Sequence, residues 1–175
     1  MNFSDQSLIA LVLINNDHRA YEKLVMKYQS DVRGLLVKLT NGNKALADDL
    51  AQDAFIRAFK YLRTFKATAS FSTWLYRISY NVFFDYTKSL KKIDHINGQE
   101  FISKDEKDVD SEIDMRNALK ILKENEKAAI LLHYYKGFSH NEIAEIMDMP
   151  LGTVKTNLLR AKEKLKEYYN YEQNR

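Results

Sequence analysis

The chain has 175 residues, a hydrophobic content of 45%, a formal net charge of +3 and no cysteine. This length suits one or two small domains with real cores, and the lack of cysteine excludes a disulfide framework and any Cys-ligated zinc. The four histidines show no ligand spacing with one another, so we expect no metal and no cofactor. Only one proline and five glycines occur, which predicts helices nearly throughout and an all-α fold.

The longest apolar run, residues 8–14, is far too short to span a bilayer. No basic residue precedes it, as a signal peptide would require. We therefore expect a soluble cytoplasmic protein that is not embedded in a membrane.

Two helices are predicted in the first sixty residues. Asp17 is placed to cap a helix over residues 20–39, and a second helix follows the turn at residues 41–43. The first turns of the second helix carry an acidic and polar patch, Asp48, Asp49, Gln52 and Asp53. Acidic side chains near a helix start interact favourably with the helix dipole and so stabilise the helix. The patch therefore has either a purely structural role or a role in docking a partner.

A third helix, starting at Phe71, has an apolar stripe and a distinct polar and aromatic face. That face carries Trp74, Arg77, Asn81, Asp85 and Lys88. Further rings at positions 76, 80, 83, 84 and 86 exceed what a small core absorbs. Aromatics interleaved with basic residues suit single-stranded nucleic acid, where each stacked base contributes about 1–3 kcal/mol. The alternative is that these rings are core or an oligomer interface.

Charge divides the chain between residues 94 and 114, where eight acids stand against two lysines. The stretch has little apolar periodicity and contains Asn97-Gly98, which predicts a flexible acidic linker over residues 91–111. The linker separates a helical domain over residues 5–90 from a second over residues 112–170. Simple solubility is the alternative explanation of its charge.

The second domain has the layout of a helix-turn-helix. Ser139 and Glu142 form a capping box, Pro150 ends the first helix, and a second helix starts near Thr153 with an apolar stripe. Between residues 150 and 170 five basic residues stand against two glutamates. The outward residues are Thr153, Lys155, Thr156, Leu159, Arg160 and Lys164. A recognition helix reads base edges with its first turns, so we expect DNA binding here; the alternative is a solvated basic face.

Four segments, in this order, resemble bacterial sigma factors of the sigma-70 family, and more narrowly the two-domain extracytoplasmic-function (ECF) class. They are DDLAQDAF at 48–55, FSTWLYRISYN at 71–81, GFSHNEIA at 137–144 and PLGTVKT at 150–156. The resemblance runs from about residue 5 to residue 168, with only the linker unmatched. It implies a first domain that engages the −10 promoter element and the polymerase clamp, and a second that reads the −35 element.

The resemblance also implies a role for individual residues. Core RNA polymerase, through its beta-prime clamp, would be bound by Asp48, Asp49, Gln52 and Asp53, and the beta flap is a further contact of the family. The −10 strand would be bound by Arg57, Tyr61, Phe65, Trp74, Arg77, Asn81, Asp85 and Lys88, with Asn81 beside a flipped base and residues 66–70 forming its pocket. The −35 duplex would be read by Thr153, Lys155, Thr156, Leu159, Arg160 and Lys164. An anti-sigma factor is a further expected partner, and one could hold the protein at the membrane.

The mechanism expected is recruitment and strand separation, with no bond made or broken and no small-molecule substrate. No catalytic triad or phosphate loop occurs in the sequence, so we expect a protein that is not an enzyme. Two other classes remain open at this point. One is a stand-alone helix-turn-helix regulator whose first half only dimerises, and the other is an RNA-binding or decoy protein that uses the aromatic face away from promoters.

Overall fold

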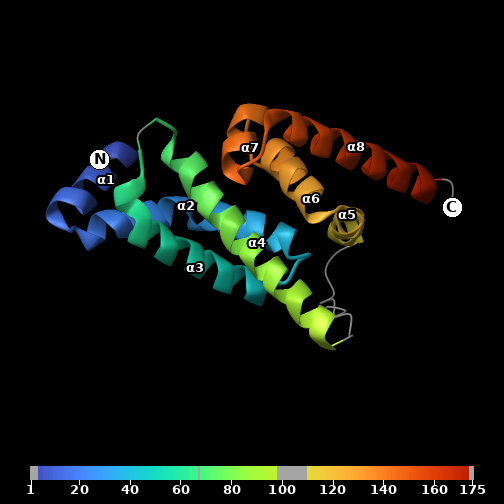
Figure 1. Cartoon of the computed structure of the whole chain (residues 1–175), viewed down its shortest axis with the longest axis horizontal. Helices are drawn as coiled ribbons and strands as arrows, with labels where there is room; N and C mark the ends of the chain where they lie inside the picture. Colours follow the sequence, from blue (N-terminus) through green and yellow to red (C-terminus); the bar gives the residue numbers. More distant parts are fainter. Residues whose placement is uncertain (1–3, 67, 98–109, 174–175) are drawn as a thin grey trace.

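A computed structural model of the chain describes residues 4–66, 68–97 and 110–173, and every regular element within them is a helix (Figure 1). The prediction of an all-α fold is confirmed. In chain order the elements are α1 (Asp5–Asn15), α2 (His18–Leu39), α3 (Lys44–Tyr61), the 3₁₀ turn η1 (Leu62–Thr64), α4 (Phe71–Asn97), α5 (Asp110–Lys120), α6 (Glu124–Ile130), the π-helical turn η2 (Leu131–Tyr135), α7 (His140–Met147) and α8 (Leu151–Gln173).

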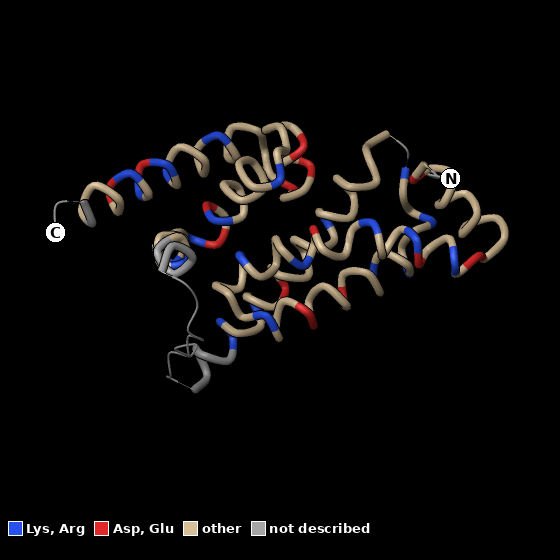
Figure 2. The backbone as a smooth tube through the Cα atoms, turned by 180° about the vertical axis from the view of Figure 1, so that it is seen from behind, with Lys and Arg blue, Asp and Glu red and all other residues tan. Residues whose placement is uncertain are grey.

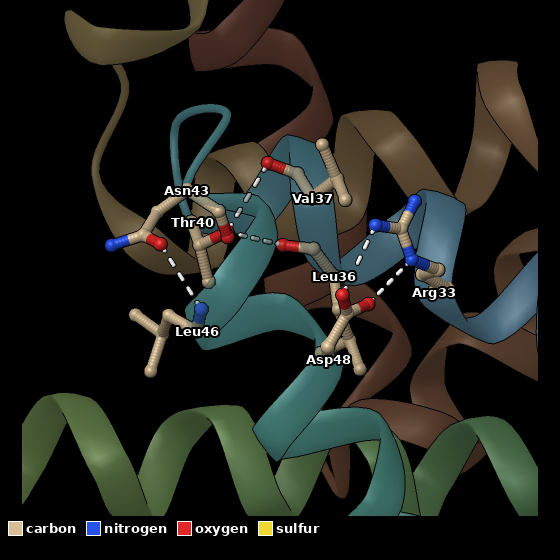
Figure 3. A network of polar contacts seen from close by, with 7 residues as sticks. All are labelled: Arg33, Leu36, Val37, Thr40, Asn43, Leu46 and Asp48. Atoms are coloured by element: carbon tan, nitrogen blue, oxygen red, sulfur yellow. Dashed lines mark hydrogen bonds and ion pairs between the residues drawn. The ribbon is translucent and has the colours of Figure 1, made fainter. Parts of the chain in front are cut away.

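Short polar side chains set where α2 and α3 begin and end. Asp17 caps α2 as predicted, since its Oδ1 accepts a hydrogen bond from the backbone amide of Arg19 at 2.9 Å. At the other end of α2, the Thr40 hydroxyl donates to the carbonyl of Leu36 at 2.8 Å (Figure 3). Asn43 then caps α3, because its Oδ1 accepts from the amide of Leu46 at 3.0 Å. These caps fix the turn that brings α3 back along α2.

The first domain is built from α2, α3 and α4, with α1 covering one end (Figure 1). On α3, Leu50, Ala54 and Ala58 are buried, whereas Leu46 is only partly buried. Small alanines on α3 allow its axis to approach its neighbours closely. The residues buried from α2 and α4 include Leu24, Val32, Leu35, Leu36, Leu39, Phe71, Leu75 and Val82.

The second domain consists of α5 to α8, and its core lies between α6, α7 and α8. The capping box predicted at Ser139 is present: its Oγ accepts from the Glu142 amide at 3.3 Å, and the Glu142 carboxylate accepts from the Ser139 amide at 2.9 Å. Asp148 ends α7 in the left-handed region, at φ 51°. The second helix begins at Leu151, two residues before the expected Thr153, because the Pro150 carbonyl already accepts from the next turn's amides.

The two domains pack directly against each other, with α4 crossing α7 (Figure 1). The rings of Tyr76 on α4 and Phe138, just before α7, meet edge to face with centroids 5.0 Å apart. The Tyr80 hydroxyl donates to Asn125 Oδ1 at 3.1 Å. One continuous group of buried apolar residues therefore runs through both domains.

This contact corrects the idea that α4 carries a surplus of aromatic surface. Tyr76, Tyr80 and Phe83 are all buried, and the first two pack against the second domain. They are not available for stacking on bases in this arrangement. For these three rings, the alternative given above, a place in a core or an interface, is the correct one. The interface is the contact between the two domains of this chain.

The predicted linker falls largely on residues 98–109, which lie outside the described residues. On its first side, α4 continues to Asn97, past the expected end of the domain at residue 90. On its second side, α5 begins at Asp110.

Candidate nucleic-acid interface

The outward face of α8 is basic and open to solvent. Val154, Leu158 and Ala161 are buried, as their spacing predicts, and this orients the opposite face outward. The exposed residues on the first turns are Thr153, Lys155, Thr156, Leu159 and Arg160. Leu159 keeps 57% of its surface exposed, so this otherwise polar face also offers apolar surface. Figure 2 shows Lys and Arg recurring along α8, whereas acidic residues gather around α7.

Lys164 differs from the other predicted −35 residues. Its Nζ lies 2.7 Å from Oε2 of Glu126 on α6, a carboxylate whose side chain is only 3% exposed. Burial alone would raise the pKa of Glu126, but the hydrogen bond from Lys164 and the Lys123 amide hold it below its ordinary value. Lys164 therefore has a structural partner inside the domain. Sequence spacing could not reveal this, since Glu126 lies on another helix.

A groove of about 590 Å³ lies between the end of α3 and the first half of α4. It brings together four of the predicted −10 residues, Tyr61, Trp74, Arg77 and Asn81. Tyr61 and Asn81 are exposed, so their polar groups face solvent at the groove. An aromatic ring, an amide with both donor and acceptor, and a guanidinium are the groups that hold an unpaired base and its phosphate.

The aromatic wall of this groove is held by its neighbours. The Phe65 ring lies 5.5 Å from the Trp74 ring and 5.8 Å from the Phe71 ring, centroid to centroid. Ser70 caps α4, because its Oγ accepts from the Thr73 amide at 3.1 Å. Of the predicted pocket loop, Lys66, Thr68 and Ala69 line the groove and Ala67 lies outside the described residues. Phe65 is thus a supporting residue of the groove rather than part of its lining.

Arg57 connects the acidic patch on α3 with the polar face of α4, two surfaces that were predicted separately from the sequence. Its Nη1 lies 2.9 Å from Asp85 Oδ2 on α4, and its Nη2 lies 2.9 Å from Asp53 Oδ2 on α3. Hydrogen bonding to Asp85 and then to Asp53 raises the pKa of Arg57. Arg57 is therefore paired with two carboxylates, and both ion pairs remain partly exposed to solvent. Lys88, further along α4, places its Nζ 4.6 Å from the Phe84 ring centroid.

The acidic patch on α3 borders a second groove, which the sequence analysis missed. This groove, of about 530 Å³, runs between α2 and α3 and is lined by Asp48 and Gln52 together with apolar side chains. The apolar members are Tyr21, Val25, Ala51, Phe55, Ile56 and Phe59. Ile56 is 59% exposed, so the groove offers apolar surface with a polar rim. The signal was present as outward apolar residues at 55, 56 and 59, which the core stripe does not explain.

Within the patch, Asp48 forms an ion pair with Arg33, whereas Asp49 is an exposed residue. Arg33 on α2 binds the Asp48 carboxylate through two nitrogens, with Nη2 3.2 Å from Oδ2 (Figure 3). The hydrogen bond from Arg33 lowers the pKa of Asp48. Asp49 and Gln52 are exposed. The patch therefore contains two carboxylates that are held in ion pairs, Asp48 with Arg33 and Asp53 with Arg57, beside the exposed Asp49 and Gln52.

Over residues 4–66, 68–97 and 110–173, no group of three His, Asp or Glu side chains is placed to hold a metal ion. In the same described part of the chain, no helix is long and apolar enough to cross a membrane.

Family models match both domains. Residues 24–93 match the model described as Sigma-70 region 2, and residues 113–165 match the model described as Sigma-70, region 4. The chain is 32% identical to the RNA polymerase sigma-H factor of Pseudomonas aeruginosa, over 91% of this chain and 90% of that protein. It is 33% identical to the ECF RNA polymerase sigma-E factor of Escherichia coli, over 91% of each.

Solved structures agree in fold. The sigma factor RpoE in complex with the anti-sigma factor NepR from Bartonella quintana has a TM-score of 0.73 and 22% identity, over 86% of this chain and 96% of that one. CnrH in complex with the cytosolic domain of CnrY also has a TM-score of 0.73 and 22% identity, over 95% of this chain and 97% of that one.

The fold and the two surfaces define a helix-turn-helix DNA-binding protein with a second helical domain. With these relatives, the chain belongs to the sigma-70 family of RNA polymerase sigma factors, in its extracytoplasmic-function class. It is a transcription initiation factor that directs RNA polymerase to promoters. A stand-alone helix-turn-helix regulator is not favoured, since the first domain matches sigma-70 region 2 and not merely a dimerisation module.

Proposed function

We propose that this chain reads the −35 element as duplex with α8 and captures one −10 strand, once melted, in the groove between α3 and α4. The observation that carries the proposal is this groove, where Trp74, Arg77 and Asn81 stand together on successive turns of one helix face. A rigid helix that presents ring, guanidinium and amide side by side suits a splayed-out base better than it suits a duplex edge. Opening then proceeds because binding of unpaired bases offsets the cost of unpairing.

For the −35 element, the proposed reading positions are the exposed residues of the first two turns of α8. Arg160 and Lys155 offer donors that suit guanine O6 and N7, and Leu159 offers apolar surface for a thymine methyl group. Lys162 and Lys166, further along the same helix and exposed, are placed for phosphates. Lys164 is assigned instead to the ion pair with Glu126.

For core polymerase, the proposed docking surface is the α2–α3 groove and its polar rim. Asp49 and Gln52 provide exposed polar contacts, and Ile56 and Phe59 provide apolar surface for a partner helix. Combined apolar and polar surface of this kind is typical of a helix-in-groove contact. Asp48 and Asp53 act indirectly here, by pairing with Arg33 and Arg57.

We further propose that an anti-sigma factor binds this chain. The support is likeness of fold to two sigma factors whose solved structures contain such a partner.

Run-off transcription tests the proposed function. Purified protein is added to core polymerase on a library of genomic fragments, and we expect transcripts that require both components. A promoter selected in this way then serves for DNase I and permanganate footprinting. Protection by the protein alone, with no permanganate-reactive bases when core is added, would contradict the proposal and favour a simple regulator.

A further inference from the structure

Two of the four histidines, His133 and His140, lie together on the second domain. Their ring centroids are 4.9 Å apart, and the ring planes are inclined by 50°. Sequence spacing did not indicate this, because seven residues of continuous helix would separate two side chains by about 10 Å. Neither ring belongs to the surfaces assigned above to DNA or to polymerase.

The turn between η2 and α7 brings the two rings together. His133 lies in the π-helical turn η2, and His140 is the first residue of α7. Gly137 between them has φ 77°, a left-handed conformation that glycine adopts without steric cost. Its amide donates to the carbonyl of His133 at 3.1 Å, and the Phe138 amide donates to that of Leu132 at 3.0 Å. These bonds fold the chain back, so that the start of α7 meets η2.

The His133 ring is held in one orientation and one tautomer. Its Nδ1 lies 2.9 Å from the carbonyl oxygen of Phe138, and a carbonyl can only accept, so Nδ1 carries the hydrogen. The ring of Tyr134 packs edge to face against it, with centroids 4.7 Å apart. In the neutral imidazole the lone pair is then on Nε2. Metal-binding histidines commonly donate their other ring N–H to a backbone carbonyl in this way.

His140 supplies a second imidazole, which the start of α7 does not use for its own cap. That cap is made by Ser139 and Glu142, whose mutual hydrogen bonds are 3.3 and 2.9 Å long. Both histidines are partly exposed. An ion can therefore reach the pair from solvent, and water can complete its coordination shell.

The separation of the rings matches that of two imidazoles on one metal ion. Imidazole nitrogen binds zinc at about 2.0–2.1 Å, which places each ring centroid roughly 3.2 Å from the ion. At coordination angles between about 90° and 109°, two such rings have centroids roughly 4.5–5.2 Å apart. The observed 4.9 Å falls within this range. Zn²⁺, Ni²⁺ and Cu²⁺ suit imidazole ligands, whereas Mg²⁺ and Ca²⁺ prefer oxygen.

We propose that His133 and His140 form a binding site for one first-row transition-metal ion of the zinc type. The ion is held by Nε2 of His133 and a ring nitrogen of His140, with water in the remaining positions. Two protein ligands make this an exchangeable site, since structural zinc sites have four. A bound ion ties the start of α7, the first helix of the helix-turn-helix, to η2. The site does not depend on the proposed DNA and polymerase contacts.

The test uses the untagged full chain and Zn²⁺ as the probe, in isothermal titration calorimetry at pH 7.5. We expect one ion per chain. His133→Gln and His140→Gln should each weaken binding by at least about tenfold, the lower end of what loss of even an outer-shell partner costs. The matched control is His18→Gln, because the His18 ring lies on the other domain, 5.5 Å from the Phe59 ring. It should leave the affinity unchanged.

Two further measurements identify the ligands. Nitrogen NMR of the imidazole rings in the wild-type chain should show Zn²⁺ shifting the Nε2 resonance of His133 while Nδ1 keeps its hydrogen. Saturating Zn²⁺ should raise the Tm of wild type and of His18→Gln, but not that of His133→Gln or His140→Gln, because a ligand that binds only the folded state stabilises it.

The inference requires both rings, and this makes it refutable. No Zn²⁺ binding by the wild-type chain, or equal binding by wild type and both variants, would overturn it. Loss of binding in only one of the two variants would also overturn it, because the ion would then be held by a single histidine. Since protons compete with metal for imidazole, binding should weaken at pH 5.5, and an affinity that does not change with pH would exclude histidine ligands.

Discussion

Lys127 offers a quantitative test of how the two domains dock. It lies on α6 with only 6% of its surface exposed, and its ammonium donates to Asn41 of the other domain at 2.6 Å. Burial lowers its pKa from 10.5 to about 8, against a smaller opposing effect of Glu124 and with a further lowering by Lys120. Since one pKa unit corresponds to about 1.4 kcal/mol, the buried charge costs the folded protein about 3 kcal/mol at pH 7.

We therefore expect Lys127→Met to raise the free energy of unfolding by up to about 3 kcal/mol at pH 7, because methionine has a similar shape and no charge. Asn41 loses its partner but is partly exposed, so water replaces the ammonium. The advantage of the variant depends on pH. Because the folded-state pKa is depressed, the cost is fully present below about pH 8 and disappears as pH rises toward 10.5.

The assay is urea unfolding followed by circular dichroism at pH 7 and pH 9.5, for wild type, Lys127→Met and the control Lys123→Met. Lys123 is exposed at the start of the same helix, so its replacement should change stability by less than about 0.5 kcal/mol. At pH 9.5 the difference between wild type and Lys127→Met should fall to roughly 1.4 kcal/mol. A variant that is less stable than wild type at pH 7, or a difference that does not change with pH, would refute the reasoning.

Three further predictions concern the proposed surfaces. Arg160→Ala should lose about 1–3 kcal/mol of discrimination between promoters, whereas Lys166→Ala should weaken all duplexes alike and flatten the salt dependence; identical effects in competition binding would contradict the proposed orientation of α8. Gln52→Ala should weaken binding to a polymerase clamp fragment in a pull-down without changing the circular dichroism spectrum, and unchanged affinity would exclude it from the docking surface. Asn81→Leu should reduce permanganate-detected opening on duplex promoters and recover part of its transcription on a template mismatched near −10. Equal loss on both templates would assign Asn81 to folding or core binding.

The helix starts and the apolar stripes could be predicted from the sequence because they depend on residues that are close together in the chain. Asp17, Asn43 and the Ser139–Glu142 pair start helices through hydrogen bonds that span two or three residues, and such spacings are visible in a linear chain. The apolar stripe at Val154, Leu158 and Ala161 likewise depends only on helical periodicity. The start of α8 was displaced by two residues, which is the usual range of uncertainty for a helix end.

The family was also determined by the sequence, because it depends on segments whose order and spacing are properties of the chain. The kind of partner that each surface suits could also be predicted from its residue types, which are basic and small polar on α8 and aromatic and amide on α4. The sequence did not reveal which helix faces line the same groove. Trp74 and Asn81 meet Tyr61 from α3 only because the two helices cross at that point.

Only the tertiary structure decided which charged groups are paired. Lys164 and Arg57 read as DNA-binding residues in the sequence, yet one binds a buried Glu126 and the other binds Asp53 and Asp85. Tyr76 and Tyr80 read as surplus aromatics, yet they are buried against the second domain. Pairing and burial depend on contacts between residues far apart in the chain, and periodicity within one helix carries no information about the neighbour it meets.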